Sequence, residues 1–357
     1  MKRALELAAL ARGRTSPNPM VGAVVVKDGR IVGEGCHQKA GGPHAEIIAM
    51  AAAGGEARGA TLYVSLEPCC HYGRTPPCTQ AIIAAGITEV HAAVLDPNPL
   101  VAGKGLQELQ RAGIRTVVGE HEDEARRLNE AFFTYITKRR PFVIVKFAMS
   151  LDGKIATRSG QSRGLTGQAW LRELHILRSQ VDAILVGVNT VLRDDPRLTV
   201  RLPVHDSRQP LRIILDSSLR TSPAARLLDP ATPGKTLIVT TARAGDEKIA
   251  RLRDQGADVL VAGDDQVDLV TLLQHLGEKE ITSLLVEGGG QVIASFVEAR
   301  LVDKVIAVIA PLLIGGSEAP TPVEGRGVES LSQALRLQSV DVRRVGEETV
   351  IIGYPVT

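Results

Sequence analysis

The chain has 357 residues, of which 44% are hydrophobic and 23% charged, and its formal net charge is +2. A single hydrophobic core stops growing below this length, so two domains are expected. The near-neutral charge offers no strong field for nucleic acid or an anionic membrane, and an aromatic content of 3% leaves few side chains for stacking bases. We therefore expect neither a nucleic-acid partner nor a membrane partner.

The first helix is expected within residues 1–14, MKRALELAALARGR, where basic residues precede an apolar run. Glu6 interrupts that run and no small-residue cleavage site follows, so an amphipathic helix is favoured over a signal peptide. The longest apolar stretch, residues 305–316, is too short to span a bilayer and contains Pro311. These features predict a soluble protein of the cytoplasm.

An alternating α/β pattern follows this helix. Residues 21–35 predict a hairpin that turns at Asp28-Gly29. The next expected elements are a helix from near His44, a strand ending at Leu66, a helix after Cys78 that ends at Gly86, a strand over 89–97 and a helix over 105–113. Such alternation is typical of a sheet covered by helices on both faces, with functional residues at the strand ends.

The domain boundary is expected at Pro141. Residues 122–140 predict one long amphipathic helix, because helices commonly end before a proline. This divides the chain into domains 1–140 and 141–357. In the second domain we expect a surface loop over 202–209 and strands over 142–150, 182–187, 211–216, 236–241, 283–290 and 304–311. The last of these strands is apolar enough for either a core or a dimer interface.

The first group of candidate functional residues is His44, Glu46, Cys69 and Cys78. Three of the four cysteines are clustered between positions 69 and 78, which favours a metal site over a disulfide framework. Catalytic zinc takes three protein ligands and keeps a fourth position for water, so His44, Cys69 and Cys78 are the expected ligands. Glu46 is close enough in sequence to accept a proton from that water and to return it to a leaving amine.

The order of these residues follows the zinc-deaminase pattern H-x-E with P-C-x-x-C. Here the second thiolate lies nine positions after Cys69, which excludes the plain nucleoside-deaminase form. Each residue alone has an ordinary structural explanation, because lone histidines and strand-end cysteines are commonly core residues; together they favour a metal. Cys70 should point away from Cys69 and serve packing, and Cys36 is interpreted as a buried thiol.

Four segments extend the pattern: SPNPMVGAVVVKDGRIVGEG, GGPHAE, EPCCHYGRTPPC and DPNPLVAGKG. They resemble the deaminase domain of the bifunctional deaminase/reductase family of bacterial riboflavin biosynthesis, in which Ser usually stands at position 70. The resemblance implies a cytidine-deaminase-like α/β/α fold, a bound zinc ion, and hydrolytic removal of the 2-amino group of 2,5-diamino-6-ribosylamino-4(3H)-pyrimidinone 5′-phosphate. It also implies substrate contacts at Asn18, His71, Arg74, Asp96 and Asn98. Amide and carboxylate groups can read the pyrimidine edge and Arg74 can hold phosphate, although Asn-Pro and Asp-Pro pairs also favour turns.

The second candidate region is LLVEGGGQVIASFVEA, where a strand runs into Gly288-Gly289-Gly290 before a helix. No G-x-G-x-x-G follows an early strand, so a Rossmann domain is not indicated. Bare amides at the start of this helix can seat a phosphate, although three glycines after a strand are often only a tight turn.

Four further segments, VKFAMSLDGKIAT, DAILVGVNTVLRDDPRLTVR, LRIILDS and VEGGG, resemble the reductase domain of the same family. The resemblance implies a dihydrofolate-reductase-like α/β fold and NADPH-dependent reduction of the ribosyl group to ribityl. The implied substrate contacts, with the arginines holding phosphate, are Ser162, Arg178, Leu198, Arg201 and Glu287. The implied NADPH contacts are Ala148, Gly164, Thr190, Asp194, Ser217, Gly289 and Gly290. Lys146 and Glu287 are the ionisable candidates nearest the chemistry; the alternative for Lys146 is a solvated lysine at a strand end.

One position departs from the reductase pattern. Many members of the family have S-x-W-I-T where this chain has SRGLT, so Gly164 replaces a tryptophan beside the cofactor. We expect hydride transfer to survive and the affinity for NADPH to differ. A homo-oligomer, and NADPH rather than NADH as the reductant, are also expected from the resemblance.

Two other functions compete with this interpretation. One is a nucleoside or tRNA deaminase fused to an inactive reductase-like domain; the low aromatic content and the GRTPPC insert count against it. The other is a structural zinc module that serves a partner protein. A structural zinc normally has four protein ligands, and Glu46 would have no purpose beside one.

Overall fold

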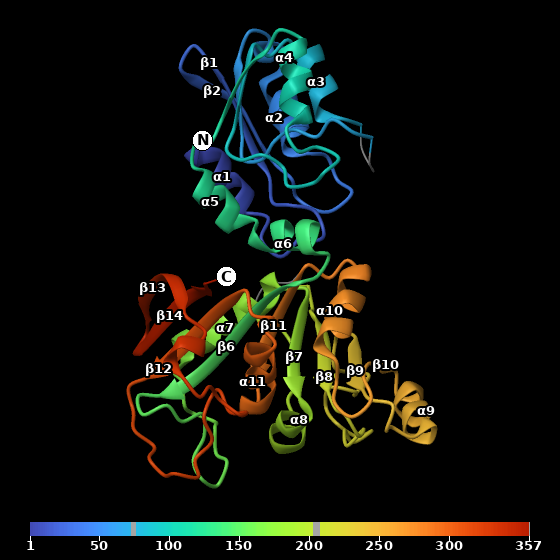
Figure 1. The fold of residues 1–357 in the computed structure, drawn as a ribbon. Coiled ribbons are helices and arrows are strands. Elements are labelled where there is room, and N and C mark those ends of the chain that lie inside the picture. The colour runs from blue at the N-terminus through green and yellow to red at the C-terminus, as the bar shows by residue number, and fades with distance from the viewer. Residues whose placement is uncertain (73–75, 203–207, 357) are drawn as a thin grey trace. The chain divides into compact units, whose positions relative to one another are not determined.

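The structure is a computed structural model that describes residues 1–72, 76–202 and 208–356. The chain forms two compact units, Met1–Arg140 and Pro141–Thr357 (Figure 1). Each unit has its own sheet and its own hydrophobic core, so each is described by itself. No helix in the described ranges is long and apolar enough to cross a membrane.

The first unit contains a five-stranded sheet in the order β2-β1-β3-β4-β5. Its strands are β1 (Gly22–Lys27), β2 (Arg30–Cys36), β3 (Thr61–Val64), β4 (Glu89–Ala92) and β5 (Arg115–Val118). Strand β1 runs antiparallel to β2 and β3, whereas β3, β4 and β5 are parallel. The predicted hairpin turn is confirmed, with Asp28 and Gly29 at φ values of 50° and 75°. The short edge strand β5 was not part of the prediction.

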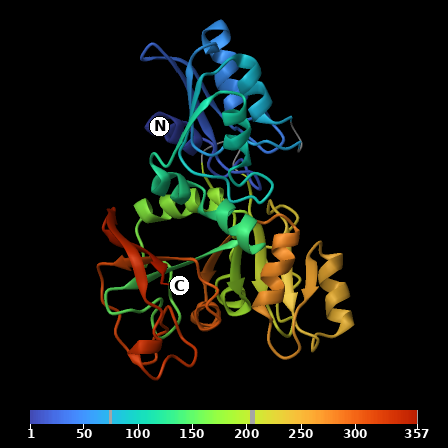
Figure 2. The ribbon, with the colours of Figure 1, turned by 45° about the horizontal axis from the view of Figure 1, so that its top comes forward.

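Helices cover both faces of this sheet, as the alternating pattern predicted (Figure 2). One face carries α2 (Ala45–Ala53), α3 (Cys78–Ala85) and α4 (Lys104–Arg111), and the other carries α1 (Lys2–Ala9), α5 (Glu122–Leu128) and α6 (Glu130–Lys138). Helix α2 lies so close to β2 that a Cβ on Gly35 would be 2.5 Å from the carbonyl oxygen of Ala45. Glycine in this strand therefore lets the helix that begins beside His44 sit directly on the sheet.

The prediction of one long helix over 122–140 is wrong, because the chain breaks at Asn129 between α5 and α6. The Asn129 side chain accepts a hydrogen bond from the Met20 amide at 2.8 Å and donates one to the Met20 carbonyl at 2.9 Å. This long-range pairing holds Asn129 at φ −109° and ψ 24°, outside helical geometry. An asparagine paired with distant backbone competes with the helix in a way that local periodicity does not reveal.

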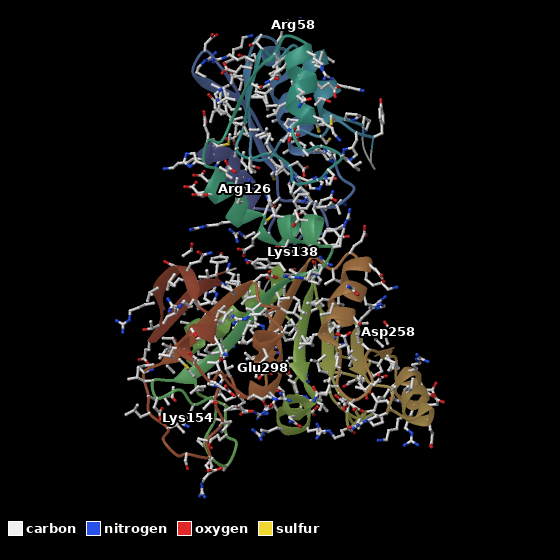
Figure 3. All side chains as sticks on the ribbon, in the orientation of Figure 1. Arg58, Arg126, Lys138, Lys154, Asp258 and Glu298 are labelled. Carbon is white, nitrogen blue, oxygen red and sulfur yellow. The ribbon has the colours of Figure 1, made fainter. Side chains whose placement is uncertain are left out.

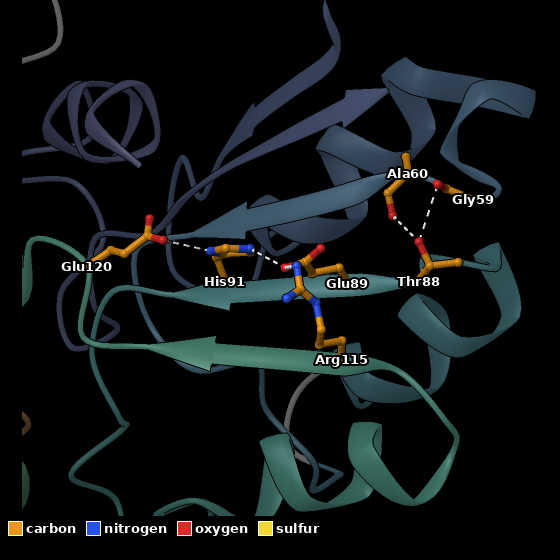
Figure 4. Close-up of polar contacts among 7 residues, drawn as sticks. All are labelled: Gly59, Ala60, Thr88, Glu89, His91, Arg115 and Glu120. Carbon is orange, nitrogen blue, oxygen red and sulfur yellow. Dashed lines mark hydrogen bonds and ion pairs between the residues drawn. The ribbon is translucent and has the colours of Figure 1, made fainter. Parts of the chain in front are cut away.

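A charged network joins β4 to the edge strand β5 and the residues after it (Figure 4). His91 Nε2 lies 2.7 Å from Glu89 Oε1, and His91 Nδ1 lies 2.8 Å from Glu120 Oε1. Arg115 on β5 also contacts Glu89. The His91 ring lies 4.5 Å from that of Tyr63 on β3, measured between ring centroids. Arg115 and Glu89 are register partners on β5 and β4, so they form a cross-strand pair of opposite charge of the kind that stabilises a sheet.

The second unit contains a nine-stranded sheet in the order β10-β9-β8-β7-β11-β6-β12-β14-β13. Its strands are β6 (Phe142–Ser150), β7 (Ala183–Gly187), β8 (Leu211–Leu215), β9 (Thr236–Thr240), β10 (Asp258–Val261), β11 (Ser283–Gly288), β12 (Lys304–Ala310), β13 (Leu337–Val345) and β14 (Glu348–Pro355). The strands from β10 to β12 are parallel, and β14 and β13 complete the sheet in antiparallel pairs. All six predicted strands are present, and β12 lies inside the sheet between β6 and β14.

The described part of the second unit has five α-helices, and its buried apolar residues form a hydrophobic core. They are α7 (Gln168–Gln180), α8 (Val188–Asp194), α9 (Asp246–Asp254), α10 (Leu269–Glu278) and α11 (Gly290–Glu298). Because β6, β7, β8 and β11 are parallel, their carboxyl ends lie at one edge of the sheet, which is where ligands usually bind in such folds. Helices α8 and α11 begin directly after β7 and β11 at that edge.

Candidate functional site

The three predicted metal ligands come together in the first unit. His44 precedes the first turn of α2, Cys69 follows β3, and Cys78 is the first residue of α3. His44 Nδ1 lies 3.2 Å from Cys78 Sγ and 3.5 Å from Cys69 Sγ. The three candidate ligand atoms all lie within 4.8 Å of one another, which is the spacing expected of atoms that share one metal ion.

The chemistry of this donor set fits zinc. Zinc accepts one imidazole and two thiolates, and three ligands leave a fourth position for water. The amide of Cys78, at the start of α3, donates to Cys69 Sγ at 3.4 Å. Hydrogen bonds from Cys78 and His44 lower the pKa of the Cys69 thiol to about 4, so this residue is ready to bind as a thiolate. The hydrogen bond with Cys69 and burial raise the pKa of the Cys78 thiol.

Glu46 lies in the first turn of α2 and is only 3% exposed. Its carboxyl group contacts the Cys78 thiol, so it reaches the metal site without belonging to the His44, Cys69 and Cys78 ligand set. Burial raises the pKa of Glu46, which increases the affinity of this carboxylate for a proton. A buried carboxyl group of this kind beside an open metal position is suited to proton transfer.

The structure adds His37, which the sequence interpretation missed. His37 is 3% exposed, its Nδ1 lies 3.0 Å from the Pro43 carbonyl oxygen, and its Nε2 lies 3.1 Å from Asn18 Nδ2. Because a carbonyl only accepts, Nδ1 carries the proton and Nε2 of the neutral ring accepts from the Asn18 amide. The oxygen of Asn18 is thereby turned away from His37. The signal available in the sequence was a second histidine seven positions before His44.

The other predicted substrate residues of the first unit lie on two segments. Asp96 and Asn98 lie between β4 and α4, and burial raises the pKa of Asp96 to about 7. His71 follows the ligand Cys69, and its buried Nδ1 has no hydrogen-bond partner among the described residues. An unpaired buried nitrogen is the kind of group that a ligand satisfies. Arg74 lies outside the described residues.

The two remaining cysteines lie outside the metal-ligand group. Cys70, which was expected to serve packing, is partly buried and its thiol donates to the Leu100 carbonyl oxygen at 3.7 Å. Cys36 is only partly buried rather than fully enclosed, because it ends β2 beside a small side cluster of the core.

In the second unit, three predicted residues form one buried charged group. Arg178 on α7 donates to Glu287 on β11 through Nε at 2.6 Å and Nη2 at 2.7 Å. Lys146 on β6 is 7% exposed, and its pKa is lowered by burial and by Arg178 against the opposing effect of Glu287. The alternative of a solvated strand-end lysine is therefore wrong. The Lys146 ammonium also lies 5.7 Å from the centre of the Trp170 ring.

Arg178, which was expected to hold a phosphate, has its guanidinium engaged by other groups of the protein. Two of its nitrogens face Glu287, and Nη1 lies 3.5 Å from the Thr199 carbonyl oxygen. Arg201 is more exposed and donates to the Thr199 hydroxyl at 3.4 Å. Arg201 is therefore the better placed of the two arginines to meet an anion from solvent.

The remaining predicted residues lie on or after the strands whose carboxyl ends share one edge. A Cβ on Gly288 or Gly289 would lie 3.7 or 3.8 Å from Thr190 Oγ1, so α8 and the glycine turn are in close proximity. Gly289 has a φ of 82° and precedes α11. The positions are Ala148 on β6, Ser162 and Gly164 before α7, Asp194 at the end of α8, Leu198 after it, Ser217 after β8, and Gly290 at the start of α11.

Two protein families match the chain. Residues 1–94 match the cytidine and deoxycytidylate deaminase zinc-binding region, which contains His44 and Cys69 together with Cys78. Residues 141–351 match the RibD C-terminal domain. The two matches fall in different units of the structure.

Similar proteins cover nearly the whole chain. The riboflavin biosynthesis protein RibD of Aquifex aeolicus is 47% identical over 351 residues, which is 98% of this chain and 96% of that protein. A solved structure of Acinetobacter baumannii RibD has a TM-score of 0.89 at 38% identity and covers 100% of this chain and 98% of its own. A deaminase/reductase structure from Thermotoga maritima has a TM-score of 0.87 at 37% identity, covering 100% of this chain and 97% of its own.

Proposed function

The chain belongs to the RibD family of bifunctional riboflavin-biosynthesis deaminase/reductases, and we propose that residues 1–140 perform the deamination and residues 141–357 the reduction. The observation that carries the first assignment is the set of His44, Cys69 and Cys78 with the buried Glu46 beside it. A structural zinc would need a fourth protein ligand and would leave Glu46 without a role. The full-length RibD relatives disfavour a nucleoside or tRNA deaminase fused to an inactive domain.

We propose that the substrate of the first step is 2,5-diamino-6-ribosylamino-4(3H)-pyrimidinone 5′-phosphate. The similar Thermotoga maritima structure is that of a diaminohydroxyphosphoribosylaminopyrimidine deaminase/5-amino-6-(5-phosphoribosylamino)uracil reductase. Asn18, oriented by His37, would present its amide oxygen to the pyrimidine. His71, Asp96 and Asn98 would complete the base contacts. Arg74 would hold the phosphate, because a guanidinium can bind it through two hydrogen bonds.

Zinc, when bound, lowers the pKa of a coordinated water and so supplies the nucleophile. Glu46 would accept the proton released from that water and return it to the leaving amine as ammonia forms. Its burial supports this role, because the raised pKa of Glu46 makes the carboxylate a stronger proton acceptor. Cys78 is the first residue of α3, and Cys69 accepts a hydrogen bond from the Cys78 amide. Both would remain thiolates throughout the reaction.

The second unit is of the NADPH-using reductase type. NADPH supplies the hydride that converts the ribosyl group to ribityl. We propose that Ala148, Gly164, Thr190, Asp194, Ser217, Gly289 and Gly290 contact the cofactor. Ser162, Arg178, Leu198, Arg201 and Glu287 would contact the deaminated substrate. Lys146, held beside Glu287 in a buried site, would donate the proton that accompanies hydride transfer.

A small-molecule substrate fits both halves of the chain, and we propose no nucleic-acid partner. The net charge of +2 is small, and nitrogen-bearing and oxygen-bearing side chains are interspersed over each unit (Figure 3). A homo-oligomer is proposed from the family resemblance, and a cytoplasmic location from the sequence features described above. None of the four cysteines forms a disulfide, which suits a reducing compartment.

The test is to follow ammonia release and NADPH oxidation together after adding the proposed substrate to the zinc-loaded chain. We expect ammonia first and NADPH consumption second. Glu46→Gln should retain zinc and lower ammonia release about 10²-fold or more, while NADPH oxidation with the already deaminated substrate continues. Unchanged ammonia release in Glu46→Gln with zinc retained would remove the deaminase assignment of this site.

A further inference from the structure

A single carboxylate closes the neck of the loop that carries Asp96 and Asn98. Glu67 Oε2 accepts hydrogen bonds from the Asp96 amide at 3.1 Å and from the Gly103 amide at 2.9 Å. Its other oxygen, Oε1, accepts from the Leu106 amide at 3.2 Å in the first turn of α4. The two ends of residues 96–103 are therefore held together by one oxygen atom of Glu67.

The same short segment also holds the tip of this loop. Cys70, three residues after Glu67, donates its thiol hydrogen to the Leu100 carbonyl oxygen at 3.7 Å. The metal ligand Cys69 lies between these two attachments in the sequence. The loop that carries two proposed substrate contacts is thus attached at its neck and at its tip to residues on either side of a zinc ligand.

The packing around Glu67 leaves little freedom for this arrangement to shift. Glu67 is 3% exposed. The start of α4 approaches the segment so closely that a Cβ on Gly105 would lie 2.1 Å from the Pro68 carbonyl oxygen and 3.1 Å from Glu67 Oε1. A buried carboxylate also suits the start of a helix, where free amides and the helix dipole favour negative charge.

We propose that Glu67 is a positioning residue for deamination, which holds the loop 96–103 in place relative to the thiolate of Cys69. The proposal rests on the proposed function of the first unit, because Asp96 and Asn98 matter for catalysis only if that unit binds the pyrimidine. Glu67 itself is not one of the zinc ligands. Its effect is to fix the distance between the groups that bind the base and the atom that binds the metal.

A carboxylate is required because both oxygens must accept. Glutamine has nearly the same shape, but one end of its amide donates, so at least one of the three backbone amides would face another donor. Leaving a buried amide without an acceptor costs more than the net value of an ordinary hydrogen bond. Glu67→Gln should therefore release the loop while preserving the volume of the side chain.

The experiment measures hydrogen exchange and steady-state deamination in full-length, zinc-loaded Glu67→Gln. We expect the peptide that covers 95–107 to exchange at least about tenfold faster, and the KM for the pyrimidine substrate to rise about tenfold with a smaller change in kcat. Zinc content should remain unchanged. The matched control is Asp182→Asn, which removes a buried carboxylate that accepts from the Thr282 and Ser283 amides at 2.8 and 3.2 Å in the second unit. Asp182→Asn should change neither the exchange over 95–107 nor the KM for the pyrimidine substrate.

Unchanged exchange over 95–107 together with an unchanged KM would overturn the proposal, and so would the same changes in exchange and KM in Asp182→Asn. If Glu67→Gln does not fold, Gly105→Ala tests the same attachment by pushing α4 away from Pro68 without removing a buried charge; it should produce the same exchange and KM changes, and their absence would also overturn the proposal. If the wild-type chain releases no ammonia, the proposed function fails, whereas the exchange measurement still decides whether Glu67 holds the loop.

Discussion

Arg178 and Glu287, 109 positions apart in the sequence, form a buried bidentate ion pair with nitrogen–oxygen distances of 2.6 and 2.7 Å. Lys146 is the second cation beside the same carboxylate. Glu287 therefore compensates two buried positive charges, one on α7 and one on β6. The charged centre of the second unit depends on one glutamate at the end of β11.

Glu287→Gln should destabilise the second unit and impair reduction. Removing one partner of a buried ion pair commonly lowers the free energy of unfolding by about 3–5 kcal/mol, because the remaining charge stays buried without compensation. Denaturant unfolding measures this loss, and ammonia release should persist because the metal ligands lie in the other unit. The control is Glu247→Gln, which removes the exposed partner of Arg251 and should change little. Equal stability of the two variants would contradict this account.

Lys146 should cause kcat/KM for NADPH oxidation to fall at alkaline pH. This alkaline limb of the pH profile should lie below the pH at which an ordinary lysine loses its proton. Burial and Arg178 lower the pKa of Lys146 from 10.5, so its proton is lost, and the rate of NADPH oxidation falls, at a lower pH than for an exposed lysine. The measurement is kcat/KM for NADPH oxidation against pH. Lys146→Arg, which stays charged and cannot give up its proton, should lower the rate of NADPH oxidation and remove this limb. A limb that persists in Lys146→Arg would assign it to another group.

His37→Phe should weaken binding of the pyrimidine without loss of zinc. Phenylalanine keeps the ring volume but loses the hydrogen bonds to Asn18 and to the Pro43 carbonyl, so the Asn18 amide becomes free to rotate. A lost hydrogen bond of about 1 kcal/mol corresponds to a KM roughly five to ten times higher. Metal analysis of the same samples is the control. An unchanged KM would show that His37 does not orient Asn18.

Gly164→Trp tests whether this position adjoins NADPH. Gly164 has a φ of 86°, and a Cβ there would have no atom within 4 Å. A Cβ at this position therefore meets no neighbour, while the left-handed backbone costs about 1 kcal/mol of stability. We expect the KM for NADPH to change while hydride transfer continues. Gly164→Ala is the matched control, because it adds the same backbone strain without the ring. Identical KM values for both variants and the wild type would argue that the position is not at the cofactor.

The network around His91 should make the first unit sensitive to acid. Arg115, through its hydrogen bond, and His91 lower the pKa of Glu89 from 4.5. The unfolded chain then takes up a proton at a higher pH than the folded chain, so the stabilising contribution is complete above about pH 4.5 and is lost as the pH falls below it. Glu89→Gln should flatten the pH dependence of thermal unfolding in this range. The same slope in both proteins would exclude Glu89 as its source.

Much of the fold could be predicted because its signals are local. The hairpin at Asp28-Gly29, the helix that ends at Gly86 and the buried strands of the second unit follow from turn residues and short apolar runs. The break at Asn129 could not be predicted, because its cause is a pair of hydrogen bonds to Met20, 109 positions away. Strands β5, β10, β13 and β14 were also missed. Strands β5 and β10 have only four residues each, and β13 is exposed along almost its whole length and so lacks an apolar pattern.

The chemical groups of this protein can be identified from the chain alone: a histidine, a glutamate and two cysteines in an order that suits a zinc deaminase, and a second half with reductase motifs. Residue type and spacing suffice there, because metal ligands and glycine turns are constrained by their own chemistry. Three relationships became visible only in the folded protein: Lys146 is buried beside Glu287, His37 is hydrogen-bonded to Asn18, and Glu67 accepts from both ends of the loop 96–103. Burial and hydrogen-bond partners arise from segments distant in the chain, so no local pattern encodes them.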